Sequence, residues 1–350
     1  MGGHLRVLRA GPGATIQDGG RFGYLRYGVT PAGPMDWTAF RTANFALGNG
    51  DRAAAIEVTV GGIEVVCEGA PLAIAFAGGA FVWRRSGMLL PTAARLLLEP
   101  GETLAARAGD FGAFAYLAVA GGFDTPVEMG SRATHMRSGM GGIEGRMLRA
   151  GDVLPAAAPA REQDTASFEA MIDAPWLARA ANIFHVVPGP QDDYFTAGAL
   201  SVFFEGQFTL TPAADRMAYR FDGPEIPHAR GYDIVSDGVA LGAIQVAGDK
   251  KPLVLMADRQ PTGGYPKLGH VARAGIGRLA QMRPGETCLF REVSVTEARA
   301  ALLRLEDEIA TTLQRLRPPR RTLTSENLLT SNLIDGVVDP LDNEPPEEEF

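Results

Sequence analysis

Cysteine, lysine and long apolar segments are scarce in this chain of 350 residues. The two cysteines, Cys67 and Cys288, are too few for a disulfide-stabilised secreted scaffold and are typical of buried, reduced thiols. No apolar run approaches the roughly 20 residues that a membrane-spanning helix requires. Residues 1–6 also lack the apolar core of a signal peptide. These absences predict a cytoplasmic protein that does not act at a membrane.

Patterns for nucleic-acid and metal binding are missing as well. The net charge is −8, and the chain contains no stripe of basic residues of the kind that contacts nucleic acid. Six acids and no base fall in the last twelve residues, 339–350, which indicates a solvated, flexible end. The five histidines are scattered, without the spacing of a zinc site.

Several familiar enzyme signatures are absent too. The chain lacks the sequence Gly-x4-Gly-Lys-Ser/Thr of a P-loop. It also lacks the sequence Gly-x-Ser-x-Gly of the nucleophile elbow in serine hydrolases. The glycine-rich stretch 139–145 is followed by a turn-and-strand pattern, whereas a dinucleotide-binding loop requires a helix there. No Met-Lys pair is present to carry biotin, so any biotin would have to be on another subunit.

What the chain does contain is a β-strand pattern. Its 43 glycines and 24 prolines separate short runs of alternating or apolar residues, such as 56–60, 63–66 and 114–119. This rhythm favours many short antiparallel strands, as in a barrel or sandwich. One early helix is predicted from Trp37 to about Leu47, with Asp36 as its N-cap. The fold class is therefore mainly β with a few helices.

Two related modules are predicted. Near-identical Pro-Gly-Glu-Thr turns begin at Pro100 and Pro284, late in each half of the chain. We place an N-terminal β-rich module at 4–155 and a C-terminal module at 183–294, with an Ala/Pro-rich linker at 156–182 between them. Apolar residues at helical spacing predict a helix over 296–316, which Pro318 and Pro319 would end. Residues 317–350 are expected to form a flexible acidic tail or a partner-binding arm.

The most informative stretch is Asp258-Arg-Gln-Pro-Thr-Gly-Gly-Tyr-Pro-Lys267, which follows an apolar strand. Lys267 is one of three lysines in a chain that otherwise uses arginine, and the pKa of an ammonium moves readily on burial. Two glycines permit close approach of the backbone to a bound group. The stretch is equally compatible with a hairpin that carries a surface lysine.

Three further clusters can carry chemistry. Residues 215–220 combine one acid, two arginines and a tyrosine, a set that suits a bound anion or an internal ion-pair network. Gln245 lies within an apolar strand, so its amide must either brace a loop or contact a ligand. Adjacent Asp192 and Asp193 follow another strand, where they suit Mg²⁺, a general base or a helix cap.

The glycine-rich stretch 15–24 contains Gln17, Asp18 and Arg21. A structural Asp–Arg pair in a tight turn is the favoured interpretation of this stretch.

Taken in order, these motifs closely resemble the family of the 5-oxoprolinase C subunit, which is also called allophanate hydrolase subunit 2 or biotin-dependent carboxyltransferase. The resemblance spans about residues 5–295 and rests on eight motifs, at 15–24, 28–36, 43–49, 117–122, 129–132, 189–195, 215–220 and 257–267. The chain departs from the family pattern at Pro261, where a second Thr is usual, and at Ala218, where Gly is usual.

The resemblance implies cyclophilin-like β-barrel modules, here two in tandem. It implies ATP-dependent hydrolysis of the lactam 5-oxoproline to glutamate, with Mg²⁺, in a hetero-oligomer with proteins like the A and B subunits of 5-oxoprolinase. Some relatives form part of urea carboxylase, so a carboxyltransferase that uses biotin on another subunit is an alternative. A non-enzymatic regulator that binds a kinase-inhibitor-like partner is a third.

The expected site follows from these motifs and the resemblance. Lys267 and Arg216 would stabilise the phosphate or lactam oxygen, and Asp258 would orient Lys267. Gln245 and Tyr265 would contact the substrate amide or its carboxylate, and Asp192 and Asp193 would hold Mg²⁺. The remaining expected substrate contacts are Asp215, Tyr219, Arg259, Gln260, Gly263 and Gly264. The hypothesis requires the Asp215 and Lys267 clusters to meet in one cavity.

Overall fold

The computed structural model describes residues 2–158, 169–314 and 316. The N-terminal module consists of two six-stranded sheets. In sheet order, the first contains β11 (Val153–Pro155), β1 (His4–Ala10), β4 (Ile63–Glu68), β9 (Thr103–Arg107), β6 (Val82–Arg85) and β7 (Met88–Leu89). The second contains β12 (Ala170–Met171), β8 (Ala94–Leu98), β5 (Leu72–Gly78), β10 (Phe114–Val119), β3 (Ala55–Thr59) and β2 (Thr15–Gln17).

An apolar core fills the space between these two sheets. Alternate residues of β4 and β9 point inward from the first sheet and meet β5 and β10 of the second. Trp83 stacks on Phe76 with ring centroids 4.3 Å apart, joining the two layers. The strands β5 and β10 are buried along their whole length, because the second sheet is covered on both faces.

The C-terminal module is a closed seven-stranded barrel. Around the barrel the order is β13 (Ile183–Pro188), β20 (Lys267–Val271), β17 (Ala243–Val246), β18 (Pro252–Leu255), β15 (Ala218–Asp222), β14 (Gln207–Ala214) and β21 (Thr287–Glu292). All neighbours pair antiparallel except β13 and β21, which are parallel. The expected barrel is thus present in the second module, whereas the first module forms a pair of sheets.

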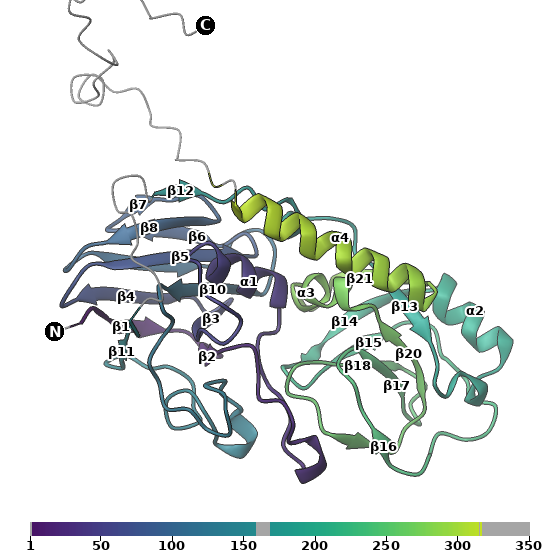
Figure 1. Ribbon diagram of the computed structural model, residues 1–350. Coiled ribbons are helices and arrows are strands. Elements are labelled where there is room, and N and C mark those ends of the chain that lie inside the picture. Colours follow the sequence, from purple (N-terminus) through teal and green to yellow (C-terminus); the bar gives the residue numbers. More distant parts are fainter. Residues whose placement is uncertain (1, 159–168, 315, 317–350) are drawn as a thin grey trace, which may run out of the picture.

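Helices fill the seam between the modules (Figure 1). The seam helices are α1 (Trp37–Phe45), α3 (Arg273–Ala280) and α4 (Val295–Gln314), and α2 (Ala197–Glu205) packs on the barrel. Asp36 caps α1 as predicted, by accepting from the backbone N–H groups of Thr38 and Ala39. The face of β5 beneath α1 presents alanines, which let the helix approach closely.

The helix α4 lies close to the span 296–316 predicted for it and extends along the seam (Figure 1). Ile309 is buried against the seam, and Glu306 forms an ion pair with Arg41 of α1 at 3.0 Å. Within the segment expected to be a linker, β12 pairs with β8, so residues 170 and 171 extend the N-terminal module. The acidic tail 317–350 lies outside the described residues.

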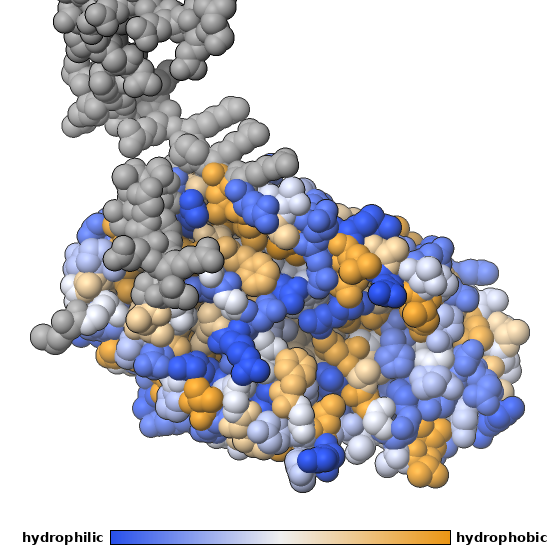
Figure 2. Space-filling view, in the orientation of Figure 1, coloured by the Kyte–Doolittle hydropathy of each residue, from blue (hydrophilic) through white to orange (hydrophobic). Residues whose placement is uncertain are grey.

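Polar and apolar residues are interspersed on the face of the molecule that Figure 2 shows. Among the described residues, no helix has the length and apolar character needed to cross a membrane.

Candidate functional site

Lys267 and Gln245 form a cross-strand pair on the outer wall of the barrel. They lie opposite each other on β20 and β17. Their neighbours Ile244, Val246 and Leu268 belong to the interior core, and side chains alternate along a strand. Gln245 and Lys267 therefore face outward, yet they are only 1% and 2% exposed.

A covering segment accounts for this burial. We call residues 234–241 and 258–266 the flap. Its two halves are joined by the short ribbon of β16 (Asp237–Gly238) and β19 (Thr262–Gly263), and by a hydrogen bond from Ile234 N to Gly264 O at 2.9 Å. Val239 packs against Ala218, Ala243 and Leu255 and holds the flap to the barrel wall. The candidate site is the contact between this flap and the wall, where the side chains of Lys267 and Gln245 are buried.

The ammonium of Lys267 donates to Asp237 Oδ2 at 2.7 Å. Asp237 lies at the exposed edge of the flap, and the hydrogen bond from Lys267 is the main reason why its pKa is lowered. Gln191 joins both residues: it donates to Asp237 Oδ2 at 3.3 Å and accepts from the Lys267 backbone N–H at 3.1 Å. Within the described chain, Asp237 is the carboxylate paired with Lys267, so the prediction that Asp258 orients Lys267 is wrong.

The Gln245 amide is only half satisfied. Its Nε2 donates to the Tyr265 carbonyl at 3.3 Å, whereas its buried Oε1 has no hydrogen-bond partner among the described residues. A buried amide oxygen without a partner is uncommon and marks a position where a ligand or water can donate. Gly263 lies against this amide: a Cβ there would lie 2.6 Å from Gln245 Nε2, so the amide would have to shift.

Other predicted contacts occupy the flap. Tyr265 is 38% exposed at its rim, next to Gly264. Arg259 is buried and donates to the Val239 carbonyl at 3.1 Å, and burial lowers the pKa of its guanidinium. Gln260 has a buried Oε1 without a partner among the described residues. Arg259, Gln260 and Tyr265 thus belong to the flap, and their role as substrate contacts stays a prediction.

Arg216 belongs to a different, structural cluster. Its guanidinium donates two hydrogen bonds to Asp258, both at 2.9 Å, one to the Gly33 carbonyl at 2.6 Å, and another to Glu57. Burial acts to lower the pKa of Arg216, but the carboxylates of Asp258 and Glu57 outweigh it and raise the pKa. Glu57 also accepts from Tyr116 Oη at 2.6 Å.

This cluster joins the barrel to β3 of the N-terminal module. The donors of Arg216 and the carboxylate of Asp258 are engaged in this internal network, and the catalytic roles expected for them stay predictions. Asp215 and Tyr219 are also engaged: Asp215 accepts from the Met217 and Ala218 backbone N–H groups, and Tyr219 donates to the Ala280 carbonyl at 2.7 Å.

The two predicted clusters do not share a cavity. Lys267 lies opposite Gln245, which lies opposite Leu253 at the start of β18. Asp258 lies in the turn that follows the other end of that strand. Arg216, Asp215 and Asp258 instead border a separate, mostly apolar cavity of about 320 Å³ that Lys267 does not line.

The predicted Mg²⁺ ligands do not form a metal site. Asp193 is paired with Arg230 at 2.6 Å on the surface. The described residues contain no cluster of three or more His, Cys, Asp or Glu side chains that could hold a metal ion. Asp192 and Asp193 instead form the turn η4 (Asp192–Tyr194), in which the Asp192 carbonyl accepts from Phe195 N.

Sequence reasoning missed Asp237 and Gln191 as site residues. A carboxylate in the turn Ser236-Asp-Gly238 was the available signal for Asp237. The pairing of that turn with the 258–267 loop depends on the flap ribbon, which the sequence does not specify.

The chain thus combines a closed β-barrel, a helical seam and a two-sheet module, with a covered ammonium on the barrel wall. Residues 27–292 match the family described as carboxyltransferase domain, subdomain A and B, and the chain belongs to this family. The family resemblance seen in the sequence is thereby confirmed.

Two relatives are each named as the C subunit of 5-oxoprolinase. The protein from Escherichia coli is 34% identical over 297 residues, which is 85% of this chain and 94% of the relative. The protein from Haemophilus influenzae is 35% identical over 305 residues, which is 87% of this chain and 96% of the relative.

Among solved structures, the Kluyveromyces lactis urea amidolyase superimposes with a TM-score of 0.81 at 27% identity. The match covers 93% of this chain but 20% of that one.

Proposed function

We propose that this chain is the C-type subunit of an ATP-dependent 5-oxoprolinase and hydrolyses 5-oxoproline to glutamate together with A-type and B-type subunits. The main support for this proposal is the share of each relative's length that aligns with this chain. The two proteins named as 5-oxoprolinase C subunits align over 94% and 96% of their length. The urea amidolyase from Saccharomyces cerevisiae, at 31% identity, aligns over 17% of its length.

The Lys267–Gln245 pair is complementary to a lactam. A lactam is a cis amide, so its carbonyl oxygen and its N–H lie along one edge of the ring. Lys267 Nζ is a donor, and the buried Gln245 Oε1 is an acceptor without a partner among the described residues. In the proposed complex Lys267 donates to the lactam oxygen while Gln245 accepts from the lactam N–H. Matching both groups selects against esters and tertiary amides, which lack the N–H.

Lys267 would also stabilise negative charge that develops on the lactam oxygen. An ammonium held in a water-poor site interacts strongly with such charge, because little solvent screens it. Asp237 orients the ammonium from the flap side, and Gln191 holds Asp237 in place. The chain's proposed share of the reaction is therefore to bind, orient and polarise the amide.

ATP would supply the phosphoryl group and the free energy that activate an otherwise unreactive amide. The carboxylates expected to bind its Mg²⁺ do not fit that role, because Asp193 is paired with Arg230. We therefore assign no step of the nucleotide chemistry to this chain and place nucleotide binding elsewhere in the assembled complex.

The test is reconstitution. The chain is co-expressed with the A-type and B-type subunits, and the complex is assayed for phosphate release and glutamate formation with and without 5-oxoproline. The proposal expects both products to depend on 5-oxoproline and on all three proteins. A complete, folded complex that forms neither product would reject it.

A carboxyltransferase function is the second candidate, and the family match itself favours it. The matched family is described as a carboxyltransferase domain, and the Kluyveromyces lactis urea carboxylase superimposes with a TM-score of 0.80. In this case the flap site would bind a urea-like amide, and biotin would be carried by another subunit. Consumption of free carboxybiotin that depends on urea and not on 5-oxoproline would favour this function.

A further inference from the structure

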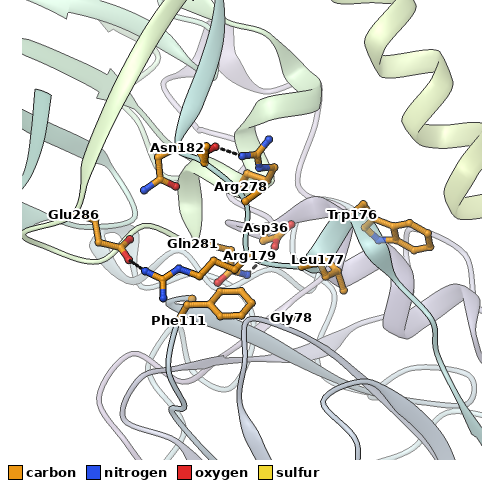
Figure 3. Close-up of a pocket in the computed structure, with 14 residues that line it drawn as sticks. Asp36, Gly78, Phe111, Trp176, Leu177, Arg179, Asn182, Arg278, Gln281 and Glu286 are labelled. Carbon is orange, nitrogen blue, oxygen red and sulfur yellow. Dashed lines mark hydrogen bonds and ion pairs between the residues drawn. The ribbon is translucent and has the colours of Figure 1, made fainter. Parts of the chain in front are cut away.

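A second cavity lies in the seam between the two modules, away from the flap site. It has a volume of about 410 Å³ and is bordered by the start of α1, the end of α3 and residues 176–182 (Figure 3). This size falls within the range typical of small-molecule sites. An adjoining cavity of about 340 Å³ shares the walls formed by Phe111, Leu177 and Arg179.

Two arginines reach this seam cavity from different segments. Arg278, on α3, is half-buried and donates to the Ala181 carbonyl, and within the described chain no carboxylate lies at ion-pair distance from it. Burial accordingly lowers the pKa of Arg278. Arg179 is exposed at the mouth, and its Nη2 lies 3.9 Å from Glu286 Oε1, a contact at the outer limit of an ion pair. Both guanidiniums retain donors for a bound anion.

Two acids also line the cavity: Glu286 at its contact with Arg179, and Asp36 at the start of α1. Asp36 Oδ1 accepts from two backbone N–H groups at the start of α1, and Oδ2 accepts from Gln281 Nε2 at 2.7 Å. The positive end of the helix dipole further compensates this carboxylate. Gln281 is also satisfied, because its Oε1 accepts from Ala113 N and Phe114 N at 2.8 and 3.0 Å.

The remaining walls include aromatic and aliphatic side chains. The Trp176 indole is 9% exposed and is anchored by donation to Thr42 Oγ1 at 3.0 Å. Figure 3 shows Phe111 and Leu177 beside Arg179 and Gln281, whereas the Trp176 indole points away from them. A site with a cationic side and an aromatic side suits an amphipathic ligand.

We propose that the seam cavity binds a small organic acid. Its carboxylate lies between Arg278 and Arg179, and its apolar body packs against Phe111 and Leu177. The bound acid contacts α3, residues 176–182 and the start of α1 together, so it stabilises the packing of the barrel against the N-terminal module. This site is independent of the amide site under the flap.

The test uses the full chain and two matched probes, cyclohexanecarboxylate and its uncharged analogue cyclohexanecarboxamide. We expect saturable, one-to-one binding of the acid by calorimetry, together with a change in fluorescence that disappears in Trp176→Phe. The amide should bind at least about tenfold more weakly, since it lacks the charge-assisted hydrogen bonds. Equal binding of acid and amide would overturn the assignment, as would binding of inorganic phosphate as tightly as the acid.

Matched variants locate the site. Arg278→Gln and Arg179→Gln should each lower the affinity for cyclohexanecarboxylate by about tenfold. Arg95→Gln is the control, because Arg95 is another half-buried arginine that donates to a backbone carbonyl, and it lies outside the cavity. Since Arg179 is exposed, its variant remains informative even if Arg278→Gln does not fold. Unchanged binding in Arg179→Gln, or lost binding in Lys267→Met, would refute the seam site.

Discussion

Lys267 on β20 lies directly opposite Gln245 on β17, and both side chains are buried on the outer wall of the barrel beneath the flap. The buried ammonium is paired with Asp237, and the amide oxygen of Gln245 on the adjacent strand has no partner among the described residues. This arrangement combines a charged donor with an acceptor, and burial strengthens the interaction of both with a bound amide.

Lys267→Met is expected to lower kcat of the reconstituted complex by about 10²–10³, because it removes a buried donor to the oxygen that gains charge. The measurement is 5-oxoproline-dependent phosphate release. Lys250→Met is the matched control, since Lys250 is a surface lysine paired with Glu225. Near-normal turnover of the Lys267 variant would remove this residue from the mechanism.

Gln245→Met is expected to lower kcat/KM by about tenfold or more while leaving stability nearly unchanged. The variant loses a weak 3.3 Å hydrogen bond but also removes a buried oxygen that has no partner in the described chain. Urea unfolding and steady-state kinetics on the same preparation separate the two effects. A large loss of stability with unaltered kcat/KM would instead make Gln245 a brace for the flap.

Gly263→Ala should impair activity, whereas Gly264→Ala should not. A Cβ at Gly263 would lie 2.6 Å from Gln245 Nε2, so the amide must shift. A Cβ at Gly264 would find its nearest atom at 3.4 Å, close to ordinary contact. Because the obstructing atom ends a flexible side chain, thermal unfolding of both variants should remain near the parent. Equal activities of the two variants would contradict the placement of Gln245 in the site.

Arg216→Met is expected to destabilise the fold by about 3–5 kcal/mol, because it leaves the carboxylates of Glu57 and Asp258 buried without a cation. Adding Glu57→Gln and Asp258→Asn should restore part of that loss. Urea denaturation of the single and triple variants measures the free energy of unfolding lost in the first and the part restored in the second. An Arg216→Met chain that is as stable as the parent but inactive in the complex would return Arg216 to a catalytic role.

His270 should make stability depend on pH. Its Nδ1 donates to the Gly189 carbonyl at 3.1 Å, and burial, aided by Lys267, lowers its pKa. The unfolded chain, with an ordinary histidine pKa of about 6.5, then binds more protons than the folded chain just below that pH. Folding free energy contributed by neutral His270 is therefore present above about pH 6.5 and is lost as pH falls below it.

Urea unfolding at about pH 7.5 and about pH 5.5 tests whether the free energy of unfolding falls on acidification. The drop in stability on acidification should be smaller in His270→Gln than in the parent. His185→Gln, at an exposed position, should leave the drop unchanged. A parent chain whose pH dependence equals that of His270→Gln would exclude the histidine as its source.

Local patterns in the sequence determined the mainly β composition, the capped helix at Asp36, the long C-terminal helix and the family. They also located the loop that carries Lys267, Tyr265 and the glycines. Alternation, capping and turn chemistry act between residues close in the chain, so the sequence displays them directly. Tertiary structure alone decided that Lys267 pairs with Asp237 and that Arg216 joins the modules through Glu57 and Asp258. Those partners depend on strand register, barrel closure and the crossing of the flap, which bring together residues 30 to 159 positions apart.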